Sequence, residues 1–322
     1  MKLIDFHCDT ILSCIDSDGE VKLRNNDLCI DIRKLKKADS LAQFFAMYVD
    51  LDKYSAPMDR CLDMIDCFYN EIEENSADIA FAGSMKELKK NRAEGKISAF
   101  ITAEEGGVLE GKLRNLRILY RLGVRLITLT WNYPNCIGYP NFKWEYKDKG
   151  LTAFGEEVVA EMNRLGMIID VSHLSDQGFY DVVRLSQKPF VASHSNARAV
   201  ENHCRNLTDD MLKKLAEKGG VAALNLEPEF LGDGGSLEAM TRHIVHMTNT
   251  AGIEAVAIGT DFDGCSTLTA IKNTGDMHLL SDALSKAGFS GGDIERIMYR
   301  NGERVIKDVL RDNWEPYPKS FV

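Results

Sequence analysis

A histidine and an aspartate stand two residues apart at the end of an apolar stretch near the start of the chain. His7 and Asp9 follow Leu3-Ile4-Asp5-Phe6, a run typical of a buried β-strand. Because successive side chains of a strand point to opposite faces, the imidazole and the carboxylate should point the same way. Both groups are common metal ligands. The pair alone therefore indicates half of a metal site.

Similar groups recur where later apolar stretches end. Three imidazoles and three carboxylates without a thiolate suit Zn²⁺, Mn²⁺, Co²⁺ or Fe²⁺. A single catalytic metal uses about three protein ligands and an open position, so this set favours two metals. Two metals roughly 3.5–4 Å apart can share a hydroxide that attacks a carbonyl, which is hydrolase chemistry. The groups are His7, Asp9, Glu105, His173, His194 and Asp261, with Glu104 beside Glu105.

Eight apolar stretches must position these groups, and they mostly alternate with helical patterns. Such near-continuous runs are typical of buried parallel strands, and the alternation predicts a (β/α)₈ barrel in which the C-terminal strand ends meet at one mouth. An open doubly wound sheet is the alternative, disfavoured because no Gly-rich phosphate loop follows the first strand. The expected strands are 3–10, part of 40–51, 97–103, 125–130, 167–172, 189–193, 221–225 and 255–260.

Helices are expected between these strands, and the whole chain, residues 1–322, is predicted to form one catalytic domain with extra C-terminal helices. The segment 12–37 is polar and irregular, so it is predicted as a long loop over one end of the barrel. His243 and His246, three apart on a helix, are expected on its surface. The expected helices are 57–75, 113–122, 152–165, 176–186, 209–218, 236–250 and 294–310.

Composition excludes several classes of protein. A hydrophobic content of 44% and a charged content of 27% are those of a globular protein with a large core. The formal charge of −10 argues against a nucleic-acid partner. No stretch approaches ~20 apolar residues, so no membrane span is expected. The eight cysteines form no Cys-x-x-Cys pair and no basic, apolar leader is visible, so a cytoplasmic location is expected.

Six short motifs occur in order along the chain: FHCDT, AEEGG, VSH, SHSNA, HCRNLTDD and GTDFDG. Together they resemble the renal (membrane) dipeptidase family of zinc peptidases, within the amidohydrolase superfamily. The resemblance implies a (β/α)₈ barrel with two Zn²⁺ per chain. It implies that His7 and Asp9 bind the first metal, that His173 and His194 bind the second, and that Glu105 bridges them.

The resemblance also implies further roles. Glu105 is preferred to Glu104 because the family's ligand directly precedes the Gly-Gly pair. Asp261 is similar to the acid that moves a proton from the attacking water to the leaving amine. Arg205 matches the arginine that binds the substrate's C-terminal carboxylate, a role suited to a planar fork of donors.

One position departs from the family pattern. Trp131 stands after LTLT, where the best-known members have a histidine that holds the scissile carbonyl. Asn132 could donate a hydrogen bond in its place, or the metal alone could suffice. Transition-state stabilisation and substrate preference are the properties that this exchange would affect.

The implied activity is zinc-dependent hydrolysis of small dipeptides, including those with a C-terminal D-residue, by a metal-bridging hydroxide. Trp131 favours one alternative, an amidohydrolase acting on a lactone, a cyclic amide or a deaminable base. A barrel that binds metal or peptide without turnover is another. The sequence leaves the oligomeric state open, with a homodimer as one candidate.

Overall fold

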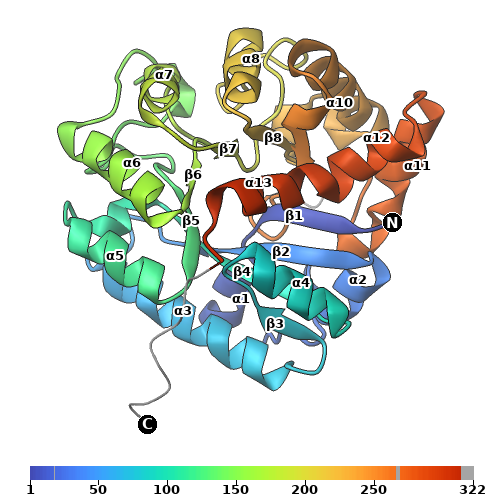
Figure 1. Ribbon diagram of the computed structural model, residues 1–322, viewed down its shortest axis with the longest axis horizontal. Helices are drawn as coiled ribbons and strands as arrows, with labels where there is room; N and C mark the ends of the chain where they lie inside the picture. Colours follow the sequence, from blue (N-terminus) through green and yellow to red (C-terminus); the bar gives the residue numbers. More distant parts are fainter. Residues whose placement is uncertain (18, 266–268, 313–322) are drawn as a thin grey trace.

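Parallel strands close into a barrel in the computed structural model, which describes residues 1–17, 19–265 and 269–312 (Figure 1). Neighbouring strands follow one another around the ring, and β1 pairs with the last strand, β9, through Asp5 and Ile258. The predicted (β/α)₈ barrel is confirmed, and the open sheet is wrong. The barrel strands are β1 (Leu3–Cys8), β2 (Ser40–Tyr48), β4 (Ile97–Glu104), β5 (Val124–Thr128), β6 (Ile168–Asp170), β7 (Val191–Ala192), β8 (Val221–Leu224) and β9 (Val256–Ile258).

One further strand, β3 (Ile79–Phe81), was not predicted. It pairs with Ile97–Ala99 at the start of β4. From Ile101 onward, β5 pairs with the same edge of β4. β3 therefore extends the sheet at the edge of β4 and is not one of the eight barrel strands. With only three residues, it is too short to show a periodic pattern.

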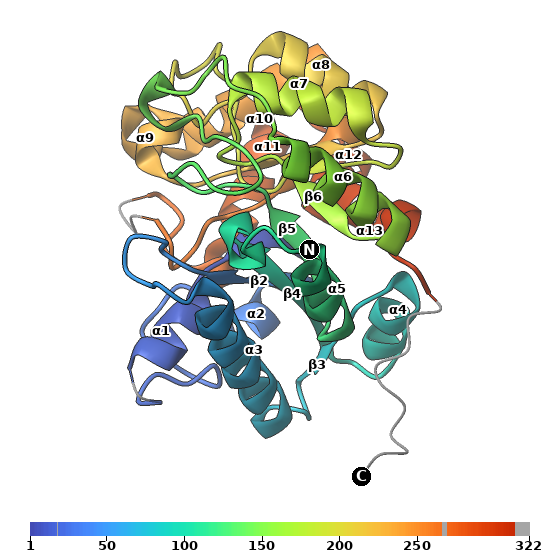
Figure 2. The same cartoon turned by 90° about the vertical axis from the view of Figure 1, so that its left-hand side faces the viewer.

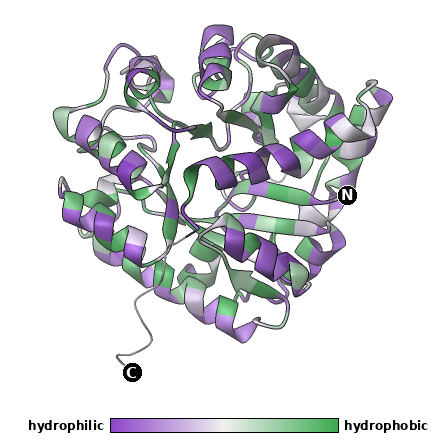
Figure 3. Cartoon of the chain, in the orientation of Figure 1, coloured by the Kyte–Doolittle hydropathy of each residue, from purple (hydrophilic) through white to green (hydrophobic). Residues whose placement is uncertain are grey.

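Helices surround the barrel, with polar outer faces around the apolar strands (Figures 1, 2 and 3). Serine or threonine caps begin several of them; Thr208, for example, accepts a hydrogen bond from the Met211 backbone N–H. None of the helices in the described part of the chain is both long and apolar enough to cross a membrane. The helices between strands are α3 (Pro57–Glu74), α4 (Met85–Ala93), α5 (Leu113–Arg121), α6 (Ala153–Leu165), α7 (Asp176–Leu185), α8 (Asp209–Glu217) and α10 (Leu237–Ala251).

The loop predicted over 12–37 contains two short helices, α1 (Thr10–Asp16) and α2 (Ile32–Lys37). The Asp31 side chain caps α2 by accepting a hydrogen bond from the Lys34 backbone N–H. Ile32 and Leu35 are the buried residues of α2. The loop prediction was therefore wrong for these helices, each too short to show a clear helical period.

The last helical elements cover the end of the barrel at which the strands begin. They are a π-helical turn (Arg296–Arg300) and α13 (Asn301–Val309), which follow α11 (His278–Lys286) and α12 (Gly291–Glu295) in the chain. Asn301 donates hydrogen bonds to the Ile253 and Val256 carbonyls next to the start of β9. Since this end is covered, the opposite end, where the strands finish, is the one available to a substrate.

Candidate metal centre

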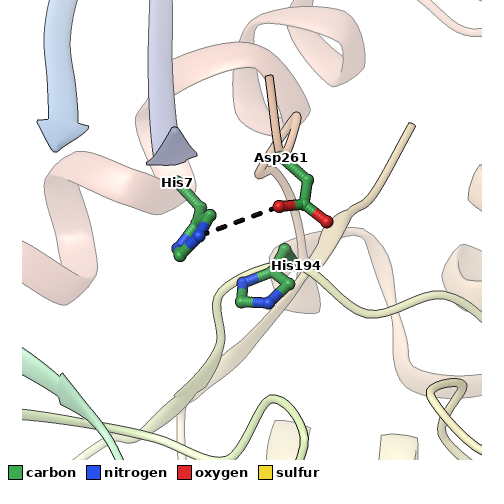
Figure 4. A group of neighbouring side chains, drawn as sticks. All are labelled: His7, His194 and Asp261. Atoms are coloured by element: carbon green, nitrogen blue, oxygen red, sulfur yellow. Dashed lines mark ion pairs between the residues drawn. The ribbon is translucent and has the colours of Figure 1, made fainter. Parts of the chain in front are cut away.

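Six polar side chains converge where the barrel strands end. His7 and Asp9 come from the end of β1, Glu104 from the end of β4, His173 and His194 from just beyond β6 and β7, and Asp261 from beyond β9. His7, His194 and Asp261 face one another although three separate strands deliver them (Figure 4). In each of three overlapping groups of three residues, the ligand atoms lie within 4.8 Å of one another.

Glu104 lies at the middle of this cluster. Its Oε2 is 3.1 Å from His7 Nε2, and its Oε1 is 3.2 Å from His173 Nε2 and 3.5 Å from His194 Nε2. Asp9 Oδ2 lies 3.3 Å from His7 Nε2 on the other side. A single carboxylate thus contacts the His7–Asp9 pair with one oxygen and the His173–His194 pair with the other.

The position predicted for Glu105 must be corrected. Its side chain turns away from the histidines and accepts hydrogen bonds from the backbone N–H groups of Gly107 (2.7 Å) and Trp131 (2.9 Å) and from the Asn135 amide. The chain leaves β4 at this residue, where Glu105 has φ +98°. Because neighbouring side chains at a strand end diverge, only one of the two acids reaches the cluster, and it is Glu104.

The donor set fits a metal ion. Among the described residues, His7 Nδ1 and Asp9 Oδ1 are buried and have no hydrogen-bond partner. His7 Nε2 is buried as well, and it faces Glu104 Oε2 and Asp9 Oδ2 without a hydrogen bond of normal geometry. Buried polar atoms of this kind are costly unless something binds them. His173 Nε2 and His194 Nε2 also face each other at 3.0 Å. Converging imidazole nitrogens and carboxylate oxygens are the ligands that Zn²⁺ and similar ions take in proteins.

The electrostatics of the cluster agree with this reading. Burial lowers the pKa of His173 to about 3 and holds the pKa of His194 well below its usual value, so both imidazoles resist a proton. Burial acts to lower the pKa of His7 as well, but Glu104 and Asp9 outweigh it and raise that pKa well above normal. Glu104 and Asp9 therefore stabilise a positive charge beside them, and a bound metal cation could supply that charge in place of a proton on His7.

Asp261 occupies a different environment. Burial raises the pKa of Asp261 to about 7, with Asp9 and Glu104 adding to the shift and His7 opposing it. Its Oδ1 lies 3.8 Å from His7 Nε2, and its Oδ2 accepts a hydrogen bond of 2.8 Å from the Asn225 amide. Asn225, buried at the end of β8, was not singled out from the sequence.

A cavity of about 450 Å³ opens beside the cluster. Of the two predicted substrate-binding residues, only Asn132 lines it. Asn132 Oδ1 lies 3.1 Å from His173 Nδ1. Arg205 is buried, donates to the His194 carbonyl (3.2 Å) and the Ser195 hydroxyl (3.4 Å), and packs over the ring of Phe230, which lines the cavity. Other lining residues include Asp9, Leu12, Tyr48, Glu104, Trp131, His173, Glu227 and Asp261.

Trp131 forms an aromatic wall with two tyrosines. Its ring meets that of Tyr48 at 4.9 Å and that of Tyr133 at 5.5 Å between centroids, both edge to face. The indole lies 6.2 Å from the His173 imidazole. The residue that departs from the family pattern therefore shapes one side of the cavity next to the cluster.

A (β/α)₈ barrel with histidines and carboxylates gathered at its C-terminal mouth is typical of metal-dependent hydrolases. The family model described as membrane dipeptidase (peptidase family M19) matches residues 1–314. The chain therefore belongs to the membrane dipeptidase family, a family of metallopeptidases that hydrolyse peptide bonds.

Individual relatives agree with this assignment. An uncharacterised dipeptidase of Schizosaccharomyces pombe is 32% identical over an alignment of 251 residues that covers 73% of this chain and 60% of that protein. Dipeptidase tcpJ of Claviceps purpurea is 28% identical over 87% of this chain and 69% of its own length. The chain thus spans about three fifths of the S. pombe protein.

Solved structures show the same fold. The crystal structure of dipeptidase AC, a metallopeptidase of family M19, superposes with a TM-score of 0.89 at 26% identity, covering 96% of this chain and 99% of that one. A metallopeptidase from Rhodobacter sphaeroides, liganded with a phosphinate mimic of the dipeptide L-Ala-D-Ala, superposes with a TM-score of 0.88, the same identity and the same coverage.

Proposed function

We propose that the chain is a zinc-dependent dipeptidase with a binuclear centre. His7 and Asp9 would hold one ion, His173 and His194 the other, and Glu104 would bridge them. The observation that carries this proposal is the Glu104 carboxylate, whose two oxygens contact the two histidine groups separately. When bound, two divalent cations supply Lewis acidity that polarises a scissile carbonyl and activates the attacking water.

Asp261 would move the proton. Its carboxylate lines the cavity beside His7, and the Asn225 amide holds Oδ2 while Oδ1 faces the cluster. A carboxylate in this position can accept a proton from the attacking water and deliver it to the leaving amine. Asn225 then acts through Asp261 by fixing the direction in which Oδ1 points.

Arg205 would bind the free C-terminal carboxylate of the substrate. A guanidinium offers two parallel donors to a carboxylate, and this one lies against Phe230 at the cavity. A longer peptide would present an internal amide there, which cannot replace the charged pair, so the site would favour dipeptides. The mimic of L-Ala-D-Ala in the R. sphaeroides relative supports a D-residue at the C-terminal position.

Asn132 would contribute on the opposite side of the scissile bond. Its amide oxygen faces His173 Nδ1, so the amide NH₂ is the group available to a substrate carbonyl. This donor would take the part that a histidine plays in the family members that this chain resembles. Trp131, directly before it, would define the apolar wall along which a substrate side chain lies.

Two matched variants test the bridging role. Glu104→Gln removes the charge between the histidine groups and should abolish hydrolysis of L-Ala-D-Ala and lower the zinc content per chain. Glu105→Gln, next to it and equally buried, should keep both ions because its side chain contacts backbone amides instead. Zinc is counted by atomic emission after dialysis, and hydrolysis by release of alanine.

Two outcomes of these measurements would contradict the proposal. If Glu105→Gln lost the metals while Glu104→Gln kept them, the bridging assignment would be wrong. If the zinc-loaded protein hydrolysed neither L-Ala-D-Ala nor L-Ala-L-Ala, the dipeptidase activity itself would be refuted. Trialanine serves as the control for the dipeptide restriction and should be cleaved far more slowly.

A further inference from the structure

A buried chain of hydrogen bonds lies behind His194. Three neighbouring strands supply it: Thr128 ends β5, Asp170 ends β6 and Ser193 follows β7, and all three side chains are fully buried. The Ser193 hydroxyl is 2.6 Å from Asp170 Oδ2 and 2.7 Å from His194 Nδ1. None of the three residues has a role in the chemistry described above.

The donors around Asp170 determine the direction of this chain. Its Oδ2 accepts from the hydroxyls of Thr128 and Ser193, each at 2.6 Å. Its Oδ1 accepts from the backbone N–H groups of Ser193 (2.8 Å) and Ser172 (3.0 Å). A carboxylate only accepts hydrogen bonds, so the single proton of the Ser193 hydroxyl points to Asp170.

The direction of the next bond follows. Because the Ser193 hydroxyl proton is donated to Asp170, its oxygen can only accept from His194, and Nδ1 must carry the ring proton. In a neutral imidazole the other nitrogen, Nε2, then has a lone pair. That nitrogen lies 3.0 Å from His173 Nε2 and 3.5 Å from Glu104 Oε1, inside the cluster.

We infer that Asp170 and Ser193 are positioning residues that hold His194 in the tautomer able to bind a metal through Nε2. The inference rests on the proposed function in that it takes the cluster to be a metal centre. Histidine ligands commonly donate their second ring N–H to an acceptor of this kind, which fixes the ring and makes the ligand nitrogen more basic.

The hydrogen bonds of Ser193 to Asp170 and His194 also show that Ser193 is not placed to act as a nucleophile. An aspartate, a serine and a histidine in hydrogen-bonded contact are also the components of a serine hydrolase triad. In such a triad the serine hydroxyl donates to the imidazole, whereas here it donates to Asp170 and accepts from His194. Ser193 is also fully buried, so no substrate carbonyl can reach its oxygen.

The first test reads the tautomer directly. Long-range ¹H–¹⁵N NMR of the metal-free wild-type protein distinguishes protonated from unprotonated ring nitrogens, and His194→Gln identifies the His194 signals by their loss. We expect His194 Nδ1 to be protonated and Nε2 to be unprotonated. The opposite tautomer would overturn the inference, and this measurement needs no variant of the hydrogen-bond chain to fold.

The second test measures zinc affinity by competition with a chromophoric chelator. Ser193→Ala should weaken binding at the His194 site by about 10- to 100-fold, the usual effect of removing such a partner. Thr128→Val is the matched control, because it removes an equally short hydroxyl bond to the same Asp170 oxygen without touching His194. Its affinity should stay close to that of the wild type.

The inference is wrong if Ser193→Ala binds zinc as tightly as the wild type, or if Thr128→Val weakens binding as much. Neither test depends on the turnover of any peptide. A protein that bound zinc with the expected tautomer but hydrolysed no dipeptide would refute the proposed function and leave this inference standing.

Discussion

His243 should make the stability of the fold depend on pH between about 6.5 and 4. The side chain was expected on the surface of its helix, and that expectation is wrong. It is fully buried on α10, where Nδ1 accepts from the Ala197 backbone N–H at 3.1 Å and Nε2 lies 3.1 Å from the Leu231 carbonyl. This arrangement requires a neutral ring, because a proton on Nδ1 would face the Ala197 N–H. Burial accordingly lowers the pKa of His243 to about 4.

The sign and size of the effect follow from this pKa. In the unfolded chain a histidine has a pKa of about 6.5, so the unfolded state takes up a proton that the folded state refuses. The full stability is therefore present above about pH 6.5, and it falls as the pH is lowered towards the folded pKa of about 4. A difference of about 2.5 pKa units corresponds to about 3 kcal/mol.

Urea unfolding from pH 8 to pH 4 measures this loss. His243→Gln keeps a donor for Leu231 but has no titrating group, so the stability difference between wild type and variant should shrink by about 3 kcal/mol across this range. Other titrating groups cancel in that difference. His246→Gln controls for the loss of an imidazole from the same helix, since His246 pairs with Asp209 at 2.7 Å near the surface. A difference that does not change with pH would refute the reasoning.

Two other substitutions have clear expected outcomes. Gly259→Ala places a Cβ 1.6 Å from the Ser193 carbonyl oxygen, so it should destabilise the fold by about 3 kcal/mol or more, whereas Gly291→Ala, with nothing within 4 Å, should not; urea titration of both variants decides this. Asn225→Ala releases Asp261 Oδ2 and should lower kcat by about tenfold or more with little change in KM; an unchanged kcat would mean that Asp261 needs no such support.

The barrel could be predicted because its strands are buried on both faces. A stretch such as Ile97–Glu104 is buried along its whole length, so it appears in the sequence as an almost continuous apolar run. β3 and α2 could not be predicted in the same way. Their three and six residues are too few to show a period, and contacts with neighbouring elements stabilise them.

The choice between Glu104 and Glu105 shows a different limit. Alternation along a strand predicts that adjacent side chains diverge, but it does not say which one faces the barrel mouth. Here the decision depends on contacts from elsewhere in the chain: the Trp131 backbone N–H and the Asn135 amide both donate to Glu105. Such contacts between distant residues leave no local pattern in the sequence.

The sequence nevertheless contains a signal for the residues that orient the site. A charged residue inside an otherwise apolar buried run must find hydrogen bonds, and two strands have one shortly before a candidate ligand. Asp5, two residues before His7, accepts from the Thr260 backbone N–H (2.8 Å) and hydroxyl (2.7 Å), and so joins β1 to the chain just before Asp261. Asp170, three residues before His173, joins β6 to Ser193 in the same way.

These two carboxylates explain how candidate ligands on separate strands come to face one another. Each joins two neighbouring strands at the level where the ligands follow, so the relative height of those ligands is set by short, buried hydrogen bonds rather than by loops. The seam between β1 and β9 brings His7 to Asp261, and the seam between β6 and β7 brings His173 to His194. The geometry of the proposed metal centre therefore originates inside the strands, two or three residues before the candidate ligands.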